Sequence, residues 1–201
     1  MAGVAAGFGC AIVEGDTTSW TAPLAIDVAI LAEPMNPRGP ILRSGARDGD
    51  VVFVSGPLGG SLLGRHLTFR PRLDLAERLA GAPALHAMMD LSDGLAMDLD
   101  RLCRSSGCGA ELRADLLEAA ISEDARTLGG RDGRPPLDHA LSDGEDYELL
   151  VVGGEALAGL EADLRPVGRI VVPPPAASTM VLLCADGRRE PIEPKGFEHF
   201  R

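Results

Sequence analysis

Aspartates set among small residues in short loops are the side chains of this sequence best suited to chemistry. Asp16 lies in the segment GDTT, Asp90 and Asp93 lie in DLSDG, and a further acidic group lies in GEDYE. Carboxylate oxygens in such loops suit a hard divalent cation such as Mg²⁺. Several such ions can bridge the oxygens of a polyphosphate, so that catalysis is positioning and charge neutralisation. The pattern therefore indicates phosphoryl transfer assisted by several Mg²⁺ ions.

The DLSDG segment joins a predicted strand to a predicted helix. The apolar run 85–89 predicts the end of a buried strand, and apolar residues at helical spacing predict a helix from Ser92 to a stop at Gly107. A helix N-terminus offers free N–H groups and the positive end of a dipole, which suit a phosphate. The alternative is that Ser92 and Asp93 only cap the helix. The local pattern leaves both interpretations open.

The acidic segment 143–148 carries four carboxylates within six residues, just before another predicted strand. Such crowding costs repulsion unless a cation lies nearby. A solvated acidic loop is the simpler alternative.

A glycine-rich loop, residues 56–60, follows a predicted strand over 51–55. It could hold a phosphate where the next helix begins. Because it lacks the lysine of a P-loop, we interpret it as a plain strand–helix connection.

No nucleophile and base stand together in the sequence. Ser92 lacks the G-x-S-x-G elbow of a serine nucleophile. The histidines fall in no recognisable triad or H-E-x-x-H setting; they are His66, His86, His139 and His199. We therefore predict no catalytic side chain in the strict sense.

Composition excludes several classes of partner. The net charge of −11 argues against binding nucleic acid or an anionic membrane. No apolar run approaches the ~20 residues of a membrane span, and residues 2–13 lack the basic start of a signal peptide. The four cysteines form no C-x-x-C pair, which predicts reduced thiols in a cytoplasmic protein. With 45% hydrophobic but only 3% aromatic residues, the core must be built from Leu, Val, Ile and Ala.

The elements that must position these residues divide at a Pro- and Gly-rich linker near residues 34–40. Before it, a helix tail and two strands, over 10–13 and 23–31, are too little for an independent domain. After it, strands and helices alternate, which predicts an α+β domain over 41–201 with a mixed sheet layered with helices. Its further predicted elements are strands 110–113, 149–152 and 167–172, helices from 61, 71–80, 122–130 and 155–164, and a hairpin at 185–187.

Several motifs together resemble one family. In order they are EGDTT (14–18), PLAIDVAILAE (23–33), DLSDGL (90–95), GEDYEL (144–149) and GFEHF (196–200). This combination is similar to thiamine-monophosphate kinase, a family of the aminoimidazole-ribonucleotide-synthetase-like superfamily. The resemblance covers nearly the whole chain. It implies that residues 1–40 are a remnant of an N-terminal ATP-binding domain and that 41–201 are the C-terminal α+β domain.

The resemblance also implies an activity. The family transfers the γ-phosphoryl group of Mg-ATP to thiamine monophosphate and so makes thiamine diphosphate, as a homodimer. Because the acceptor is already an anionic phosphate oxygen, no strong general base is needed. The implied ligands are, for ATP, Gly15, Asp16, Arg43 and Ser92; for Mg²⁺, Asp16, Asp90 and Asp93; and for the substrate, Glu145 and Phe197.

The sequence departs from the family pattern in two respects. An N-terminal third of the family, with its G-D-D-A-A, S-T-D-T and N-L-S-D motifs and strands of the dimer barrel, has no counterpart here, and Glu14 and Asp143 stand where glycine is usual. The leading hypothesis is a kinase of this family. The alternative is a truncated, non-catalytic paralogue that acts as a ligand-binding or regulatory module. Another ATP-dependent member of the superfamily is a third interpretation, against which GEDYEL and GFEHF argue.

Overall fold

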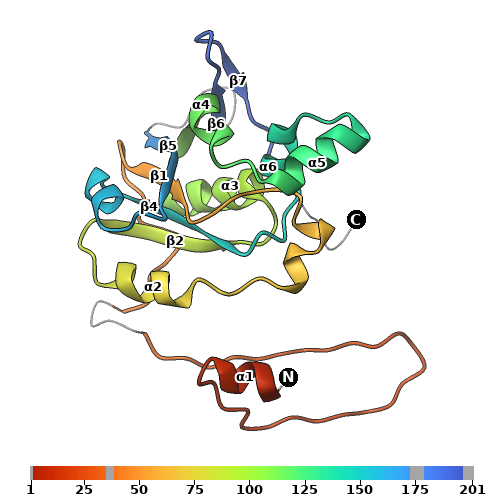
Figure 1. Cartoon of the computed structure of the whole chain (residues 1–201). Helices are drawn as coiled ribbons and strands as arrows, with labels where there is room; N and C mark the ends of the chain where they lie inside the picture. Colours follow the sequence, from red (N-terminus) through yellow and green to blue (C-terminus); the bar gives the residue numbers. More distant parts are fainter. Residues whose placement is uncertain (1, 35–38, 173–178, 197–201) are drawn as a thin grey trace. The chain divides into compact units, whose positions relative to one another are not determined.

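The computed structural model describes residues 2–34, 39–172 and 179–196 (Figure 1). The chain forms two compact units, Met1–Ala32 and Glu33–Arg201. The domain boundary predicted at residue 40 stays a prediction. The Pro-rich loop predicted over 173–178 lies outside the described residues.

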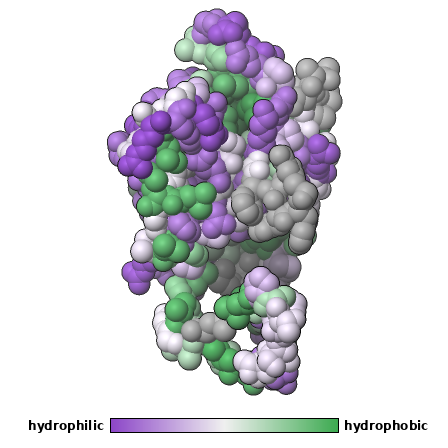
Figure 2. Space-filling model, turned by 90° about the vertical axis from the view of Figure 1, so that its right-hand side faces the viewer, coloured by the Kyte–Doolittle hydropathy of each residue, from purple (hydrophilic) through white to green (hydrophobic). Residues whose placement is uncertain are grey.

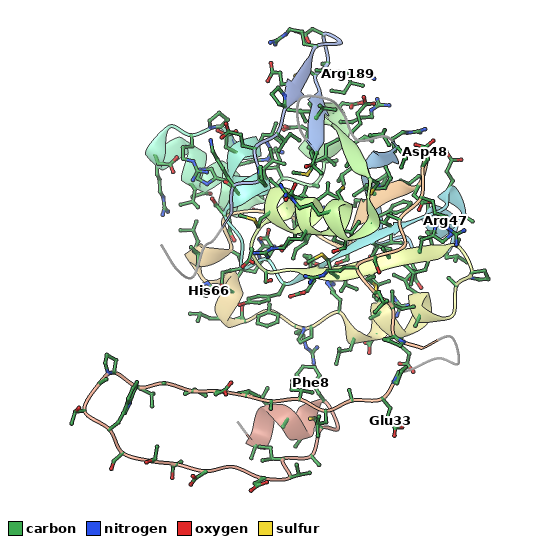
Figure 3. All side chains as sticks on the ribbon, turned by 180° about the vertical axis from the view of Figure 1, so that it is seen from behind. Phe8, Glu33, Arg47, Asp48, His66 and Arg189 are labelled. Atoms are coloured by element: carbon green, nitrogen blue, oxygen red, sulfur yellow. The ribbon has the colours of Figure 1, made fainter. Side chains whose placement is uncertain are left out.

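The first unit consists of helix α1 (Ala2–Gly7) and an open, extended loop. The strands predicted over 10–13 and 23–31 are wrong, since no residue in 2–34 has strand structure. A strand requires a hydrogen-bonded neighbour, and propensity alone does not supply one. The apolar side chains of the loop are therefore open to solvent, with Leu24 at 86% exposure. Figures 2 and 3 show this unit's apolar surface and its outward-pointing side chains.

The second unit is built on a seven-stranded mixed sheet, with strand order β2-β4-β1-β5-β3-β6-β7. Every neighbouring pair is antiparallel except β3 and β6, which are parallel. This confirms the predicted α+β class with a mixed sheet. The strands are β1 (Val51–Val54), β2 (Leu85–Leu91), β3 (Gly109–Arg113), β4 (Glu148–Gly153), β5 (Arg165–Val171), β6 (Met180–Leu183) and β7 (Arg189–Pro191).

Helices and short 3-10 turns connect these strands. The α-helices are α2 (Leu73–Ala80), α3 (Leu95–Ser106), α4 (Ala114–Glu118), α5 (Glu123–Asp132) and α6 (Pro136–Ser142). The 3-10 turns are η1 (Ser61–Leu63), η2 (Arg65–Leu67) and η3 (Glu155–Gly159). Across the described segments, none of the helices has the length and apolar character that crossing a membrane requires.

Several predicted helix boundaries differ from the structure. The helices expected from residue 61 and over 155–164 are only the short turns η1 and η3, and α4 and α6 were not predicted. Ser122 caps α5 as predicted, since its side chain accepts the Ala125 N–H. The helix continues past Gly129 to Gly133, where a φ of 78° ends it. A mid-helix glycine is tolerated, whereas a left-handed residue terminates the helix.

The core lies on both faces of the sheet, between α3 on one side and α2 on the other (Figure 1). Along β1, Val52 and Val54 pack into the cluster that includes α3, while Val51 and Phe53 pack into the cluster that includes α2. This alternation follows from the two-residue period of a strand. The core is mainly Leu, Val, Ile and Ala, as the composition predicted, and all four cysteines are free.

Candidate active site

Two loops that are far apart in sequence meet at the end of β2. The Glu145 N–H donates to the Ser92 carbonyl at 2.7 Å, and the Tyr147 N–H donates to the Leu91 carbonyl at 2.8 Å. Gly144, the residue before Glu145, adopts φ 73°, and a Cβ on it would lie 2.9 Å from the Ser92 carbonyl oxygen. The DLSDG and GEDYE motifs therefore form one surface. Strand β2 reaches Leu91, further than predicted, because it pairs with β4 up to Glu148.

The C-terminal segment also reaches this surface. A Cβ on Gly196 would lie 2.8 Å from the Met97 Cβ and would collide with the Asp93 carbonyl. Only glycine therefore fits where the chain passes the DLSDG turn. Phe197, predicted to contact the substrate, is the next residue and lies outside the described residues.

The start of α3 differs from the prediction. Gly94, at φ 109°, is the N-cap, and Ser92 is not. Instead, the N–H groups of Ser92 and Asp93 donate to the buried Asp98 carboxylate at 3.1 and 3.0 Å. Burial raises the pKa of Asp98, while the backbone hydrogen bond from Asp93 opposes that shift. The N–H groups of Ser92 and Asp93 in the DLSDG turn are thus occupied by a side chain of the helix itself. Gly107 ends α3 in the left-handed conformation, as predicted.

Arg101 is the cation next to the predicted metal ligands. Its guanidinium pairs with Asp93 and with Asp98, the latter at 3.0 Å. Asp90 is exposed, and its carboxylate has no hydrogen bond with a described residue. Within the described ranges no three His, Cys, Asp or Glu side chains gather as a metal-binding set. Two carboxylates on one turn nevertheless fit Mg²⁺, which usually takes one or two carboxylates and completes its shell with phosphate oxygens and water.

Asp146 shows that the acidic segment is not a solvated loop. The residue is 3% exposed. Both carboxylate oxygens accept the Gly59 N–H at 3.0 Å, and Arg65 pairs with Oδ1 at 2.8 Å. Burial raises the pKa of Asp146 to about 7, against the lowering effects of Gly59 and Arg65. The cation that the crowded carboxylates require is an arginine of this chain.

Glu148, like Asp146, is a buried carboxylate that pairs with an arginine of this chain. Arg72 donates to it through Nε at 2.7 Å and Nη2 at 2.8 Å, and Ser55 donates at 2.6 Å. A Cβ on Gly56 would collide with the Glu148 carboxylate, so a side chain at this position would displace that carboxylate from its present place. The sequence interpretation missed Arg65, Arg72 and Arg101. Charge balance signalled that cations were needed but not which ones.

Asp143, which replaces a usual glycine, is also held by neighbours. It accepts the Gly60 N–H at 3.1 Å and contacts His139 Nδ1 at 2.8 Å and Arg134 at 3.4 Å. The Gly59 and Gly60 N–H groups therefore bind carboxylates of the acidic segment. The phosphate role considered for this loop is excluded, and the interpretation as a plain connection is retained.

Tyr147 and Phe69 add an aromatic pair to the site that sequence reasoning did not identify. Their rings stack with centroids 4.1 Å apart and an interplanar angle of 20°. The Tyr147 hydroxyl donates to Glu145 Oε2 at 2.9 Å. Burial, followed by this bond, raises the pKa of Tyr147. Because Phe69 lies 78 positions before Tyr147, spacing offered no signal for the pair.

The structure does not bring Arg43 to this surface. The Arg43 carbonyl accepts from Ser106 at 3.5 Å, at the C-terminal end of α3. Asp93 precedes the other end of that 12-residue helix, which spans about 18 Å. Gly15 and Asp16 belong to the first unit, where Asp16 Oδ1 accepts the Thr17 N–H at 2.8 Å.

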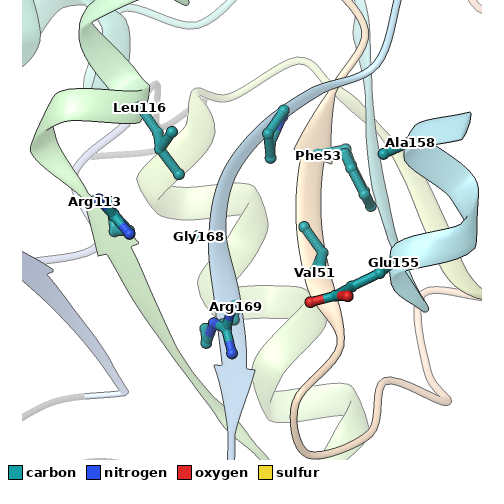
Figure 4. Close-up of a pocket in the computed structure, with 9 residues that line it drawn as sticks. Val51, Phe53, Arg113, Leu116, Glu155, Ala158, Gly168 and Arg169 are labelled. Atoms are coloured by element: carbon teal, nitrogen blue, oxygen red, sulfur yellow. The ribbon is translucent and has the colours of Figure 1, made fainter. Parts of the chain in front are cut away.

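A groove of about 390 Å³ lies elsewhere, on the sheet face that carries Val51 and Phe53 (Figure 4). It crosses β1 and β5, with Leu116 on one side and Ala158 on the other. None of the predicted site residues lines it, so it is separate from the candidate site.

The fold and the paired loops define a known class. Residues 52–171 match the family AIR synthase related protein, C-terminal domain, and the chain belongs to that family. Its relatives are thiamine-monophosphate kinases, in agreement with the motif resemblance. The chain is 41% identical over 195 residues to the one from Rhodopirellula baltica, covering 94% of this chain and 59% of that protein. It is 30% identical over 211 residues to the one from Aquifex aeolicus, covering 95% and 63%.

Solved structures agree with this assignment. AaThiL complexed with AMPPCP and TMP has a TM-score of 0.61 at 30% identity, covering 80% of this chain and 54% of that one. The hydrogenase maturation protein HypE from E. coli has a TM-score of 0.59 at 18% identity, covering 77% and 52%, and shares the fold. The chain thus spans about 59% of the R. baltica relative.

Proposed function

We propose that this chain acts in the ATP-dependent phosphorylation of thiamine monophosphate to thiamine diphosphate. The observation that carries the proposal is the meeting of Ser92, Asp93 and Glu145 on one surface, with Gly196 leading the chain to the same turn. The identity to thiamine-monophosphate kinases and the likeness to AaThiL complexed with AMPPCP and TMP support it.

The proposed roles divide between the two ligands. Glu145 and Phe197 contact thiamine monophosphate, and Ser92 contacts the nucleotide. Gly15, Asp16 and Arg43 stay proposed ATP ligands, with Asp16 also on Mg²⁺. An anionic phosphate oxygen is itself the nucleophile, so these residues bind and orient rather than remove a proton.

Mg²⁺ is the proposed metal, with Asp90 and Asp93 as ligands on the DLSDG turn. When bound, the ion neutralises charge on the transferring phosphate. Arg101 neutralises Asp93 in the present structure. The proposal further includes a homodimer in the cytoplasm that binds neither nucleic acid nor membrane.

A second candidate function is a non-catalytic, ligand-binding paralogue. It is favoured by the pairing of Asp93 with Arg101, which occupies one of the two proposed metal ligands. Under this alternative the chain binds thiamine monophosphate through Glu145 but does not phosphorylate it.

The deciding experiment measures thiamine diphosphate formed by the purified chain with ATP, Mg²⁺ and thiamine monophosphate. Asp93→Ala should abolish turnover, while Asp163→Ala, which removes an exposed carboxylate elsewhere, should leave it unchanged. Binding of thiamine monophosphate without turnover would favour the paralogue. If the chain shows neither binding nor turnover, both candidate functions are refuted.

A further inference from the structure

The backbone of Glu145 and Tyr147 is held in an uncommon conformation. Both have left-handed values, with φ 58° and 52°, which residues with side chains seldom adopt. Such conformations persist only where the surroundings impose them, and they cluster at ligand sites. Here the hydrogen bonds to Ser92 and Leu91 impose them. The loop is therefore built to present these two side chains at the DLSDG turn.

The side chains of Phe69, Tyr147 and Glu145 contact one another in that order. Phe69 stacks on the Tyr147 ring, and the Tyr147 hydroxyl donates to Oε2 of Glu145. The other oxygen, Oε1, has no hydrogen bond with a described residue. Glu145 is half-buried, so Oε1 can meet a ligand while Oε2 is held.

We propose that Tyr147 is a positioning residue that holds the Glu145 carboxylate in the orientation in which it receives the thiamine moiety of the substrate. This inference rests on the proposed function. A glutamate side chain has several rotatable bonds, and a fixed Oε2 removes most of that freedom before the ligand arrives. The carboxylate then faces a cationic thiazolium ring without further ordering.

The first test compares binding of thiamine monophosphate to the whole chain by calorimetry. Tyr147→Phe removes the donor but keeps the stacked ring, and affinity should fall about tenfold, since a hydrogen bond to a charged group is lost. Thr68→Val is the matched control, because it removes a neighbouring exposed hydroxyl whose bond to the Arg65 carbonyl is long, 3.4 Å. Its affinity should equal that of the wild type.

Phe69→Leu tests whether Tyr147 acts only through loop packing, because this substitution disturbs the aromatic stack but keeps the Tyr147 hydroxyl. We expect a smaller loss of affinity for Phe69→Leu than for Tyr147→Phe. Equal losses would show that only the packing of the loop matters, and would overturn the positioning role. In turnover assays the effect of Tyr147→Phe should appear in KM for thiamine monophosphate rather than in kcat.

Tyr147 is the only tyrosine in the chain, so its ionisation can be followed by near-ultraviolet absorbance without ambiguity. Glu145→Gln should lower its pKa, because a charged acceptor for the neutral phenol is lost. An unchanged titration would overturn the hydrogen bond on which the inference depends.

The outcomes distinguish the inference from the proposed function. Binding that is equal in wild type and Tyr147→Phe overturns the inference alone. Absence of binding in the wild type overturns the proposed function and, with it, the substrate role of Tyr147.

Discussion

At the scale of single residues, burial and hydrogen bonding act on Asp146 in opposite directions. Burial raises its pKa to about 7, and nearby Glu148 and Asp143 add to the shift, while Gly59 and Arg65 oppose it. In the unfolded chain the carboxyl has an ordinary pKa of about 3.9. The folded state therefore binds this proton more tightly than the unfolded state does.

This difference predicts a pH dependence of stability. The contribution of Asp146 to the free energy of unfolding should be complete below about pH 4 and be lost as the pH rises through about 7. Within that window the loss is at most about 1.4 kcal/mol per pH unit. Asp146→Asn, which cannot ionise, should lack this component. Urea unfolding of both proteins across the window measures the difference, and parallel pH profiles would contradict the raised pKa.

At the scale of elements, the candidate site depends on the close approach of two loops. Gly144 and Gly133 have similar left-handed backbones, with φ 73° and 78°. A Cβ at Gly144 would lie 2.9 Å from the Ser92 oxygen, whereas a Cβ at Gly133 would have no atom within 4 Å. The two positions separate the cost of the backbone conformation from the cost of the contact.

Substituting alanine at each position tests this approach. Gly133→Ala should lower the free energy of unfolding by about 1–2 kcal/mol through the left-handed conformation alone. Gly144→Ala should lower it by about 1–3 kcal/mol more, because the added methyl group overpacks the loop contact. Chemical denaturation provides both values. Equal losses of unfolding free energy in the two variants would show that the loops accommodate the added methyl group without a further loss of stability.

At the scale of the whole molecule, the extended segment of the first unit is suited to self-association. Leu24, Ile26, Val28 and Ile30 alternate along it and are all exposed. Unpaired, extended apolar segments pair readily with another chain. We expect the chain to associate through this segment.

A pair of double variants tests this association. Ile26→Lys with Ile30→Lys places charges on the apolar face, and it should shift the chain toward monomer in analytical ultracentrifugation. Ala25→Lys with Ala29→Lys adds the same charge at the intervening positions and is the control. Association that is equally strong in both variants would place the interface elsewhere.

Much of the second unit followed from sequence patterns. Apolar periodicity located β1, the body of β2 and α3, and the small number of aromatic residues predicted an aliphatic core. These features are local, because side-chain period and capping chemistry act within a few residues. The motifs DLSDG and GEDYE are likewise plain in the amino-acid sequence, and they indicated the family.

Tertiary structure decided which groups those motifs bind. Asp146 pairs with an arginine 81 positions away and Glu148 with one 76 positions away. The Gly59 and Gly60 N–H groups, in a loop that the local pattern offered to a phosphate, are instead taken by carboxylates of the fold. The strands expected before residue 32 did not form, since no neighbouring strand pairs with them in the described residues. The physical reason is common to all three cases: a hydrogen-bonding group is satisfied by what packing brings to it, and packing joins residues that are distant in sequence.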